Sequence, residues 1–145
     1  MIRTVLTVCV GNVCRSPMAE GLLRRSLPAA TITSAGIGAL SGQPAASHAI
    51  ELLHESDIDI SGHRARQISE WMCRQADLIL VMETEHKHMI ERLFASTRGK
   101  LFTLGHHGKF DVFDPYRLGR ERFEDCLKLI SRGVDDWTAR IRALA

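Results

Sequence analysis

The sequence of 145 residues has no apolar run long enough to span a membrane, and its formal net charge is only +2. It also lacks a basic run and a platform of interleaved aromatic residues, which disfavours nucleic-acid binding. No CxxC pair occurs among its four cysteines, and its histidines lack zinc-ligand spacing and are expected mainly at the surface or in loops. We therefore expect no metal, no cofactor, no nucleic acid and no membrane insertion. The strand pattern starts without a charged leader, so we expect a cytoplasmic protein in a reduced compartment.

What is present is the composition of one globular domain, with 45% hydrophobic and 25% charged residues. Strand patterns alternate with helical patterns, which predicts an α/β fold over residues 1–145. We expect a single-domain three-layer sandwich, with a central four-stranded parallel sheet and helices on both faces. Strands are predicted at residues 2–8, 31–34, 78–81 and 101–104, and helices at 18–26, 45–53, 68–73, 84–94 and 120–144. The apolar face of the helix at 84–94 is predicted to consist of Met89, Ile90, Leu93 and Phe94.

The most informative segment, CVGNVCRSP at residues 9–17, joins the first predicted strand to the first helix. Backbone N–H groups of such a turn, with the positive end of the helix, can hold a phosphate group. The planar guanidinium of Arg15 can bind two phosphate oxygens, and the same positive field favours the thiolate of Cys9 as a nucleophile. We expect phosphate binding by the loop residues Val10, Gly11, Asn12, Val13, Cys14, Arg15 and Ser16.

Neighbouring residues support this turn. Gly11 and Asn12 tolerate tight or left-handed backbone, Ser16 is a good N-cap, and Pro17 suits the first position of a helix. The carboxyl ends of parallel strands meet at one edge of the sheet. Segments that follow the other three strands, including Ser34 and the loop 105–118, should therefore lie beside Cys9.

The segment VCVGNVCRSPMAE at residues 8–20 resembles the signature of the low-molecular-weight protein tyrosine phosphatases. Further matching segments occur in the family's order, namely SAG at 34–36, HRARQ at 63–67, DLILVME at 77–83 and DPY at 114–116. They cover nearly the whole chain, and the resemblance extends to the bacterial branch associated with exopolysaccharide or capsule export. It implies that Cys9 attacks phosphorus, that Ser16 donates to its sulfur, and that Asn12 fixes the loop.

The same resemblance places the general acid at Asp114. By itself, Asp114-Pro115 is more typical of a turn than of catalysis, but its combination with the cysteine loop favours catalysis. Pro115 restricts the backbone of Asp114 to extended conformations and so directs its carboxyl group. Asp111 is the competing candidate acid, although no proline follows it.

Leu40 and Tyr116 are predicted to form the walls of the substrate slot, since an aromatic ring beside the acid can stack on a phosphotyrosine ring. Many eukaryotic members of the family carry an aromatic residue where this chain has Leu40, and a second tyrosine directly after the one that matches Tyr116. This chain departs from that pattern with Leu40 and Arg117. The departures predict a more open slot, in which Arg117 favours acidic residues that flank the phosphotyrosine. Leu40 could also be a simple packing residue in its loop.

Five further residues are expected to support the loop from behind: Ser34, His63, Arg66, Gln67 and Glu83. Each of them could instead be a solvent-facing polar side chain. Cys14 has two open roles, as a small buried filler or as the partner of Cys9 in a reversible disulfide under peroxide. Cys73 and Cys126 are predicted to be core residues on helices.

The resulting prediction is a metal-independent protein tyrosine phosphatase that forms a cysteinyl-phosphate. By resemblance, its partner is a tyrosine-phosphorylated protein, a bacterial autokinase of polysaccharide export, and the enzyme is a monomer or weak oligomer. One alternative is a thioredoxin-coupled arsenate reductase, which would need a close pair of further cysteines, whereas Cys73 and Cys126 are far apart in sequence. Another is an inactive phosphate-binding adaptor.

Overall fold

The computed structural model describes residues 1–145 and alternates strands with helices. The strands are β1 (Thr4–Cys9), β2 (Thr31–Gly36), β3 (Leu78–Val81) and β4 (Leu101–Thr103). The helices are α1 (Arg15–Ser26), α2 (Ser47–His54), α3 (Glu70–Gln75), α4 (Thr84–Leu93) and α5 (Arg120–Ala143), with a short 3-10 helix, η1 (Ala95–Thr97), after α4.

The four strands form one parallel sheet in the order β2-β1-β3-β4. β1 therefore lies in the middle of the sheet, and its last residue, Cys9, is in register with Gly36 at the end of β2. A Cβ atom on Gly36 would lie 2.4 Å from the carbonyl oxygen of Val10. Glycine is thus required where β2 passes the turn that follows β1.

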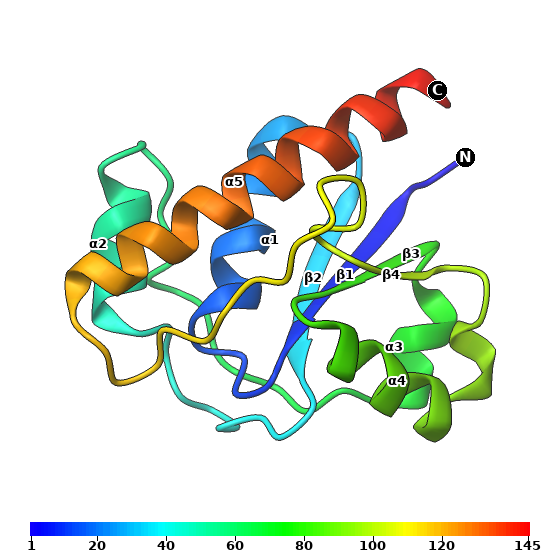
Figure 1. Cartoon of the computed structure of the whole chain (residues 1–145), viewed down its shortest axis with the longest axis horizontal. Helices are drawn as coiled ribbons and strands as arrows, with labels where there is room; N and C mark the ends of the chain where they lie inside the picture. The colour runs from blue at the N-terminus through cyan, green and yellow to red at the C-terminus, as the bar shows by residue number, and fades with distance from the viewer.

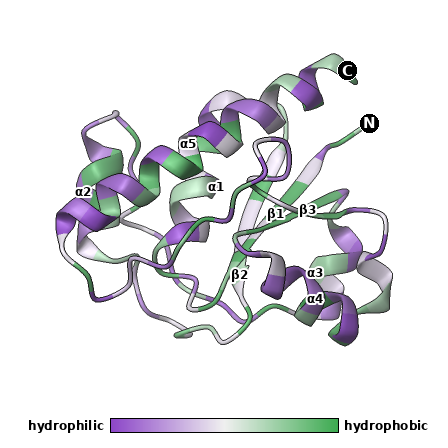
Figure 2. Cartoon of the chain, viewed as in Figure 1, coloured by the Kyte–Doolittle hydropathy of each residue, from purple (hydrophilic) through white to green (hydrophobic).

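Helices α1, α2 and α5 cover one face of the sheet, and α3 and α4 cover the other, as Figure 1 shows. All four residues of β3 are buried, as expected for a parallel strand covered on both faces, and Figure 2 shows the hydrophobic colouring of this strand. The predicted three-layer α/β sandwich is confirmed. No helix combines the length and the apolar character that crossing a bilayer would require.

Some local predictions were wrong. α1 begins at Arg15, three residues before the predicted start, with Cys14 as the N-cap residue. Ser16 therefore lies inside the first turn and is not the N-cap, and Pro17 is the third helical residue, where an N–H would have no partner within the helix. On α4, Leu93 is exposed although it was assigned to the apolar face, and His86 is buried although the histidines were expected mainly at the surface.

Candidate active site

The turn after β1 is held by its carbonyl groups. The carbonyl oxygens of Cys9, Val10 and Gly11 accept hydrogen bonds of 3.0 Å from the N–H groups of residues 37, 38 and 40, and the carbonyl of Val13 accepts one of 2.8 Å from residue 46. The segment after β2 therefore fixes the outer side of the turn. Gln67 supports that segment in turn, because its side-chain oxygen accepts from Ala39 N and its amide donates to the carbonyl of Ile37.

The inner side of the same turn carries the N–H groups. None of the backbone N–H groups of residues 10–14 donates a hydrogen bond within the protein. Backbone N–H groups that converge in a turn before a helix form an anion-binding concavity. The geometry thus supplies the phosphate cradle that the sequence predicted.

Asn12 is the residue that braces the turn. It adopts the left-handed backbone conformation, with φ of 59°, and is completely buried. Its amide group donates to Ser16 Oγ at 2.8 Å and to Ser34 Oγ at 3.0 Å, and its Oδ1 accepts from Arg66 N at 2.9 Å. His63 Nε2 lies 2.7 Å from its carbonyl oxygen. The side chains of Asn12 and Ser16 thus lie behind the cradle and hold its shape, in line with the roles that the resemblance implied for them, while phosphate binding by the loop stays a prediction.

The nucleophile predicted from sequence lies at the floor of the cradle. Cys9 Sγ is 3.0 Å from Ser16 Oγ, and both residues are buried. Because Ser16 Oγ already accepts from Asn12 Nδ2, its own hydrogen is available to the sulfur. Ser16 is thereby placed to stabilise negative charge on Cys9.

Arg15 reaches the cradle from the first turn of α1 and is 1% exposed. Its Nη1 donates to Glu83 Oε2 at 2.6 Å and to the carbonyl oxygen of Val112 at 2.9 Å. Its buried Nε has no hydrogen-bond partner in the protein. One part of the guanidinium is thus tied to the end of β3 and to the loop before α5, and Nε remains available for an anion.

The predicted acid lies beside this guanidinium. Asp114 Oδ2 is 3.7 Å from Arg15 Nη2, and Oδ1 accepts from Tyr116 N at 3.0 Å, so the turn expected at Asp114-Pro115 also forms. Asp111 has a different role, because its carboxylate accepts from the N–H and hydroxyl of Thr84 at the start of α4. Asp111 therefore anchors the loop, and Asp114 faces the cradle.

These groups line one hollow of about 130 Å³. It brings together the predicted nucleophile, arginine, acid and both slot walls, and also Gly38, which the sequence reasoning did not select. Val112 was also missed, because it acts through a backbone carbonyl that carries no sequence signal. The lining residues are Cys9, Val10, Gly11, Val13, Cys14, Arg15, Gly38, Leu40, Asp114 and Tyr116.

The other cysteines differ from Cys9 in their surroundings. All four are free and buried. Burial is the main cause that raises the pKa of the Cys14 thiol and of the Cys126 thiol to about 12, so both remain protonated at neutral pH. Cys73 packs in the cluster on the α3 and α4 side of the sheet, whereas Cys126 packs in the cluster on the α5 side. Both are core residues, as predicted.

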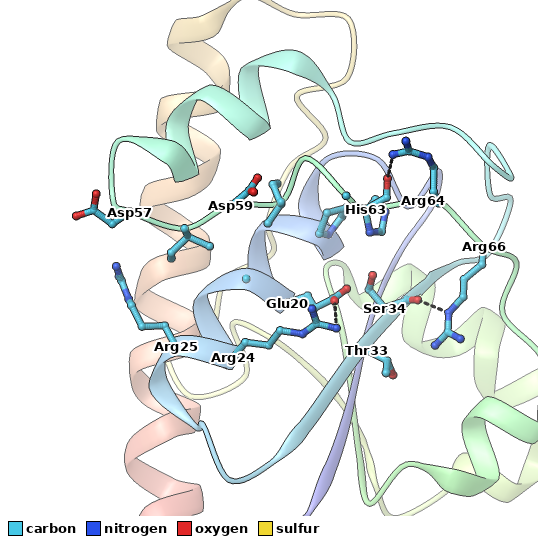
Figure 3. Close-up of a pocket in the computed structure, with 15 residues that line it drawn as sticks. Glu20, Arg24, Arg25, Thr33, Ser34, Asp57, Asp59, His63, Arg64 and Arg66 are labelled. Carbon is cyan, nitrogen blue, oxygen red and sulfur yellow. Dashed lines mark hydrogen bonds and ion pairs between the residues drawn. The ribbon is translucent and has the colours of Figure 1, made fainter.

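A larger hollow of about 820 Å³ lies behind the cradle, between α1, the edge strand β2 and residues 57–66 (Figure 3). Its arginines are already engaged: Arg24 binds Glu20 and the carbonyl of Ile32, Arg66 binds the carbonyl of Ser34, and Arg64 binds the carbonyl of His63. The contacts of Arg24 and Arg66 cover carbonyl groups along the open edge of β2, which protects that edge from pairing with another strand. The smaller hollow holds the reactive groups.

Comparison with known proteins agrees with this geometry. The model of the family "Low molecular weight phosphotyrosine protein phosphatase" matches residues 4–144. The chain is 51% identical over 144 residues to "Probable low molecular weight protein-tyrosine-phosphatase EpsP" of Ralstonia nicotianae, covering 99% of both chains. It is 42% identical to the low molecular weight protein-tyrosine-phosphatase Wzb of Escherichia coli K12, covering 99% of this chain and 98% of that protein. The solved structure of Vibrio vulnificus Wzb in complex with benzylphosphonate superposes with a TM-score of 0.93 at 38% identity, covering 97% of this chain and 99% of the other.

Proposed function

The chain belongs to the low-molecular-weight phosphotyrosine protein phosphatase family, and from this membership we propose that it hydrolyses phosphotyrosine in proteins through a cysteinyl-phosphate. One observation carries the proposal: Cys9, Arg15 and Asp114 line the same hollow of about 130 Å³. A nucleophile, a cation and an acid around one concavity are the groups that phosphate monoester hydrolysis needs.

In the first step, Cys9 Sγ attacks phosphorus and the bond from phosphorus to the phenolic oxygen breaks. Charge on the three equatorial oxygens is stabilised by the N–H groups of residues 10–14 and by the free Nε of Arg15. Asp114 donates a proton to the departing phenolate. The loop and Arg15 line the hollow before substrate binds, so little reorganisation is needed as charge develops.

In the second step, water attacks phosphorus, Asp114 accepts its proton, and the sulfur leaves as a thiolate stabilised by the Ser16 hydroxyl. Inorganic phosphate and the free enzyme result. No step needs a metal ion, because Arg15 and the backbone supply the positive charge.

Substrate preference follows from the mouth of the hollow. Val10, Leu40 and Tyr116 are each about 40% exposed there and present apolar surface suited to an aryl ring. The side chain of phosphotyrosine is long enough to bring phosphorus to a buried sulfur, whereas phosphoserine is shorter. Arg117, whose guanidinium lies 5.3 Å from the centre of the Tyr116 ring, adds positive charge for acidic neighbours of the phosphotyrosine.

The deciding experiment measures turnover of p-nitrophenyl phosphate and of matched phosphotyrosine and phosphoserine peptides. We expect activity on the first two substrates, near-complete loss for Cys9→Ser, and a fall of about 10²- to 10⁴-fold for Asp114→Asn. Asp111→Asn is the matched control, because it removes a carboxylate from the same loop. It should keep the turnover that depends on the acid, because Asp114 is unchanged. Robust turnover by Cys9→Ser would refute the nucleophile assignment.

The arsenate reductase and adaptor alternatives have separate outcomes. Cys73 and Cys126 lie in core clusters associated with opposite faces of the sheet, which disfavours a disulfide relay between them. Thioredoxin-dependent reduction of arsenate without phosphatase turnover would nevertheless select the reductase. Binding of phosphate without any turnover would select the adaptor.

We further propose that the cellular substrate is a bacterial tyrosine autokinase of polysaccharide export, and that the enzyme meets it in the cytoplasm. This rests on the resemblance of the signature segments to that branch of the family. The direct test is loss of phosphotyrosine from a purified autophosphorylated kinase of this type, compared between the native chain and Cys9→Ser. An unchanged phosphotyrosine content with the native enzyme, under conditions where peptides are hydrolysed, would contradict it.

A further inference from the structure

His86 is a buried polar side chain that the mechanism above does not use. It lies on α4 and is 5% exposed. Its Nε2 is 3.2 Å from Glu83 Oε2, the same oxygen that accepts the 2.6 Å hydrogen bond from Arg15 Nη1. One carboxylate oxygen therefore contacts both the guanidinium of the active site and the imidazole behind it.

The surroundings of His86 favour its neutral form. Burial lowers its pKa most, the positive charge of Arg15 also lowers it, and the carboxylates that face it, Glu83, Glu85 and Asp111, oppose this shift. Its Nδ1 is buried and has no hydrogen-bond partner. A protonated ring would carry an N–H at Nδ1 without an acceptor, which is costly in a buried position. A neutral ring with its hydrogen on Nε2 leaves no N–H at the unpartnered Nδ1 and places the donor on the nitrogen that lies 3.2 Å from Glu83 Oε2.

We propose that His86 is a positioning residue for Arg15 and acts through Glu83. The imidazole restrains the Glu83 carboxylate from the α4 side, so that the carboxylate holds Arg15 Nη1 and leaves Nε directed toward the anion. Without His86, Glu83 gains rotational freedom because its side chain is about one-third exposed, with a relative accessibility of 32%. Arg15 would then sample orientations that bind an oxyanion less well.

A core-filling role for His86 predicts a different behaviour. A buried polar group with an unpartnered nitrogen can be replaced by an apolar residue with little loss of stability, or even a gain. If His86 only fills space, His86→Leu should therefore keep its affinity for phosphate. If His86 positions Arg15, anion affinity should fall while thermal stability is retained.

The experiment compares His86→Leu, His86→Gln and the control His88→Leu, which alters an exposed histidine on the same helix. Calorimetry gives the Kd of inorganic phosphate, kinetics give kcat/KM for p-nitrophenyl phosphate, and thermal unfolding gives Tm. We expect His86→Leu to weaken phosphate binding and to lower kcat/KM by about 10-fold, at little change in Tm. His86→Gln, which keeps an N–H donor near the position of Nε2, should recover most of this loss, and His88→Leu should match the native chain.

A double-mutant cycle with Glu83→Gln tests the route of the effect. If His86 acts through Glu83, His86→Leu should change phosphate affinity by less than about two-fold once Glu83 is replaced. Independent, multiplicative losses would overturn the proposal, as would native phosphate affinity in His86→Leu. The inference rests on the proposed phosphatase function only for kcat/KM, because calorimetric phosphate binding is measurable even if the chain proves not to be a phosphatase.

Discussion

The hydroxyl of Ser16 lies 3.0 Å from the sulfur of Cys9 and accepts a 2.8 Å hydrogen bond from Asn12, which leaves its own hydrogen available to donate to a Cys9 thiolate. The contact joins the end of β1 to the first turn of α1. It stabilises sulfur most when sulfur carries negative charge, which happens before attack and again when the cysteinyl-phosphate breaks down.

Ser16→Ala should therefore slow the second chemical step more than the first. We expect kcat for p-nitrophenyl phosphate to fall by about 10- to 100-fold, consistent with loss of a hydrogen bond to a charged group. Rapid mixing should reveal a burst of p-nitrophenol followed by slow turnover. Ser41→Ala, at an exposed position of the neighbouring loop, is the control and should behave like the native chain. A fall in the burst rate as large as the fall in kcat would contradict the role assigned to Ser16.

Asn12 combines a backbone requirement with a side-chain requirement, and two substitutions separate them. Asn12→Ala should reduce stability by about 3 kcal/mol, because it leaves buried partners unpaired and places alanine at φ of 59°. Asn12→Gly removes the same hydrogen bonds without the backbone cost and should be about 1 kcal/mol more stable than Asn12→Ala. Both should bind phosphate weakly. Urea unfolding and calorimetry measure the two effects.

Lys109 provides the matched control, since it is exposed and has φ of 58°. The stability difference between Lys109→Ala and Lys109→Gly should resemble that between the two Asn12 variants, and neither change should affect phosphate binding. Native phosphate affinity in Asn12→Gly would show that the side-chain bonds of Asn12 do not shape the cradle.

The sequence predicted the strands along the chain, the parallel sheet and most residues of the hollow, though not Gly38, because these depend largely on local signals. Apolar runs rich in β-branched residues mark β1 and β3, and the cysteine loop has fixed spacing between Cys9 and Arg15. Asp114 was placed correctly because a parallel sheet brings the ends of its strands to one edge.

The features that sequence did not reveal depend on tertiary contacts. Ser16 looked like an N-cap, but a bond to Asn12 and a contact with Cys9 occupy its hydroxyl, so the helix begins one turn earlier than its apolar pattern suggested. His86 looked like a surface histidine, because only the fold shows that it is buried and that its Nε2 lies 3.2 Å from the Glu83 oxygen that binds Arg15. Leu93 fits the helical period of α4 but lies where no other element covers it.

Gly36 is expected to tolerate no side chain. A Cβ at this position would lie 2.4 Å from the carbonyl oxygen of Val10, a backbone atom of the cradle that cannot move without moving the anion-binding N–H groups. Gly36→Ala should lower stability by about 1–3 kcal/mol and weaken phosphate binding. Gly62→Ala, where nothing lies within 4 Å, should change neither property. Urea unfolding and phosphate calorimetry on both variants test this, and unaltered phosphate binding in Gly36→Ala would contradict it.

Cys14 is expected to protect Cys9 from peroxide by forming a disulfide with it. This reaction should be slow, because its rate depends on how much of the Cys14 thiol is deprotonated. Peroxide converts the Cys9 thiol to a sulfenic acid and releases water; attack by Cys14 on that sulfur then forms the disulfide and releases a second water. Because burial raises the pKa of Cys14 to about 12, only a very small fraction of the molecules carries the attacking thiolate at pH 7.

The rate of disulfide formation, after the sulfenic acid has been formed, should therefore rise about 10-fold per pH unit between pH 7 and pH 9. Mass spectrometry after brief exposure to peroxide, with quenching at each pH, measures the link and the competing sulfinic acid at Cys9. Overoxidation should dominate at pH 7 and decline as pH rises. Cys14→Ser should abolish the link at every pH, whereas Cys73→Ser, in the cluster on the α3 and α4 side, should leave it unchanged. A link that forms equally fast at pH 7 and pH 9 would mean that Cys14 becomes exposed before it reacts, because a thiol held in its buried site would remain protonated.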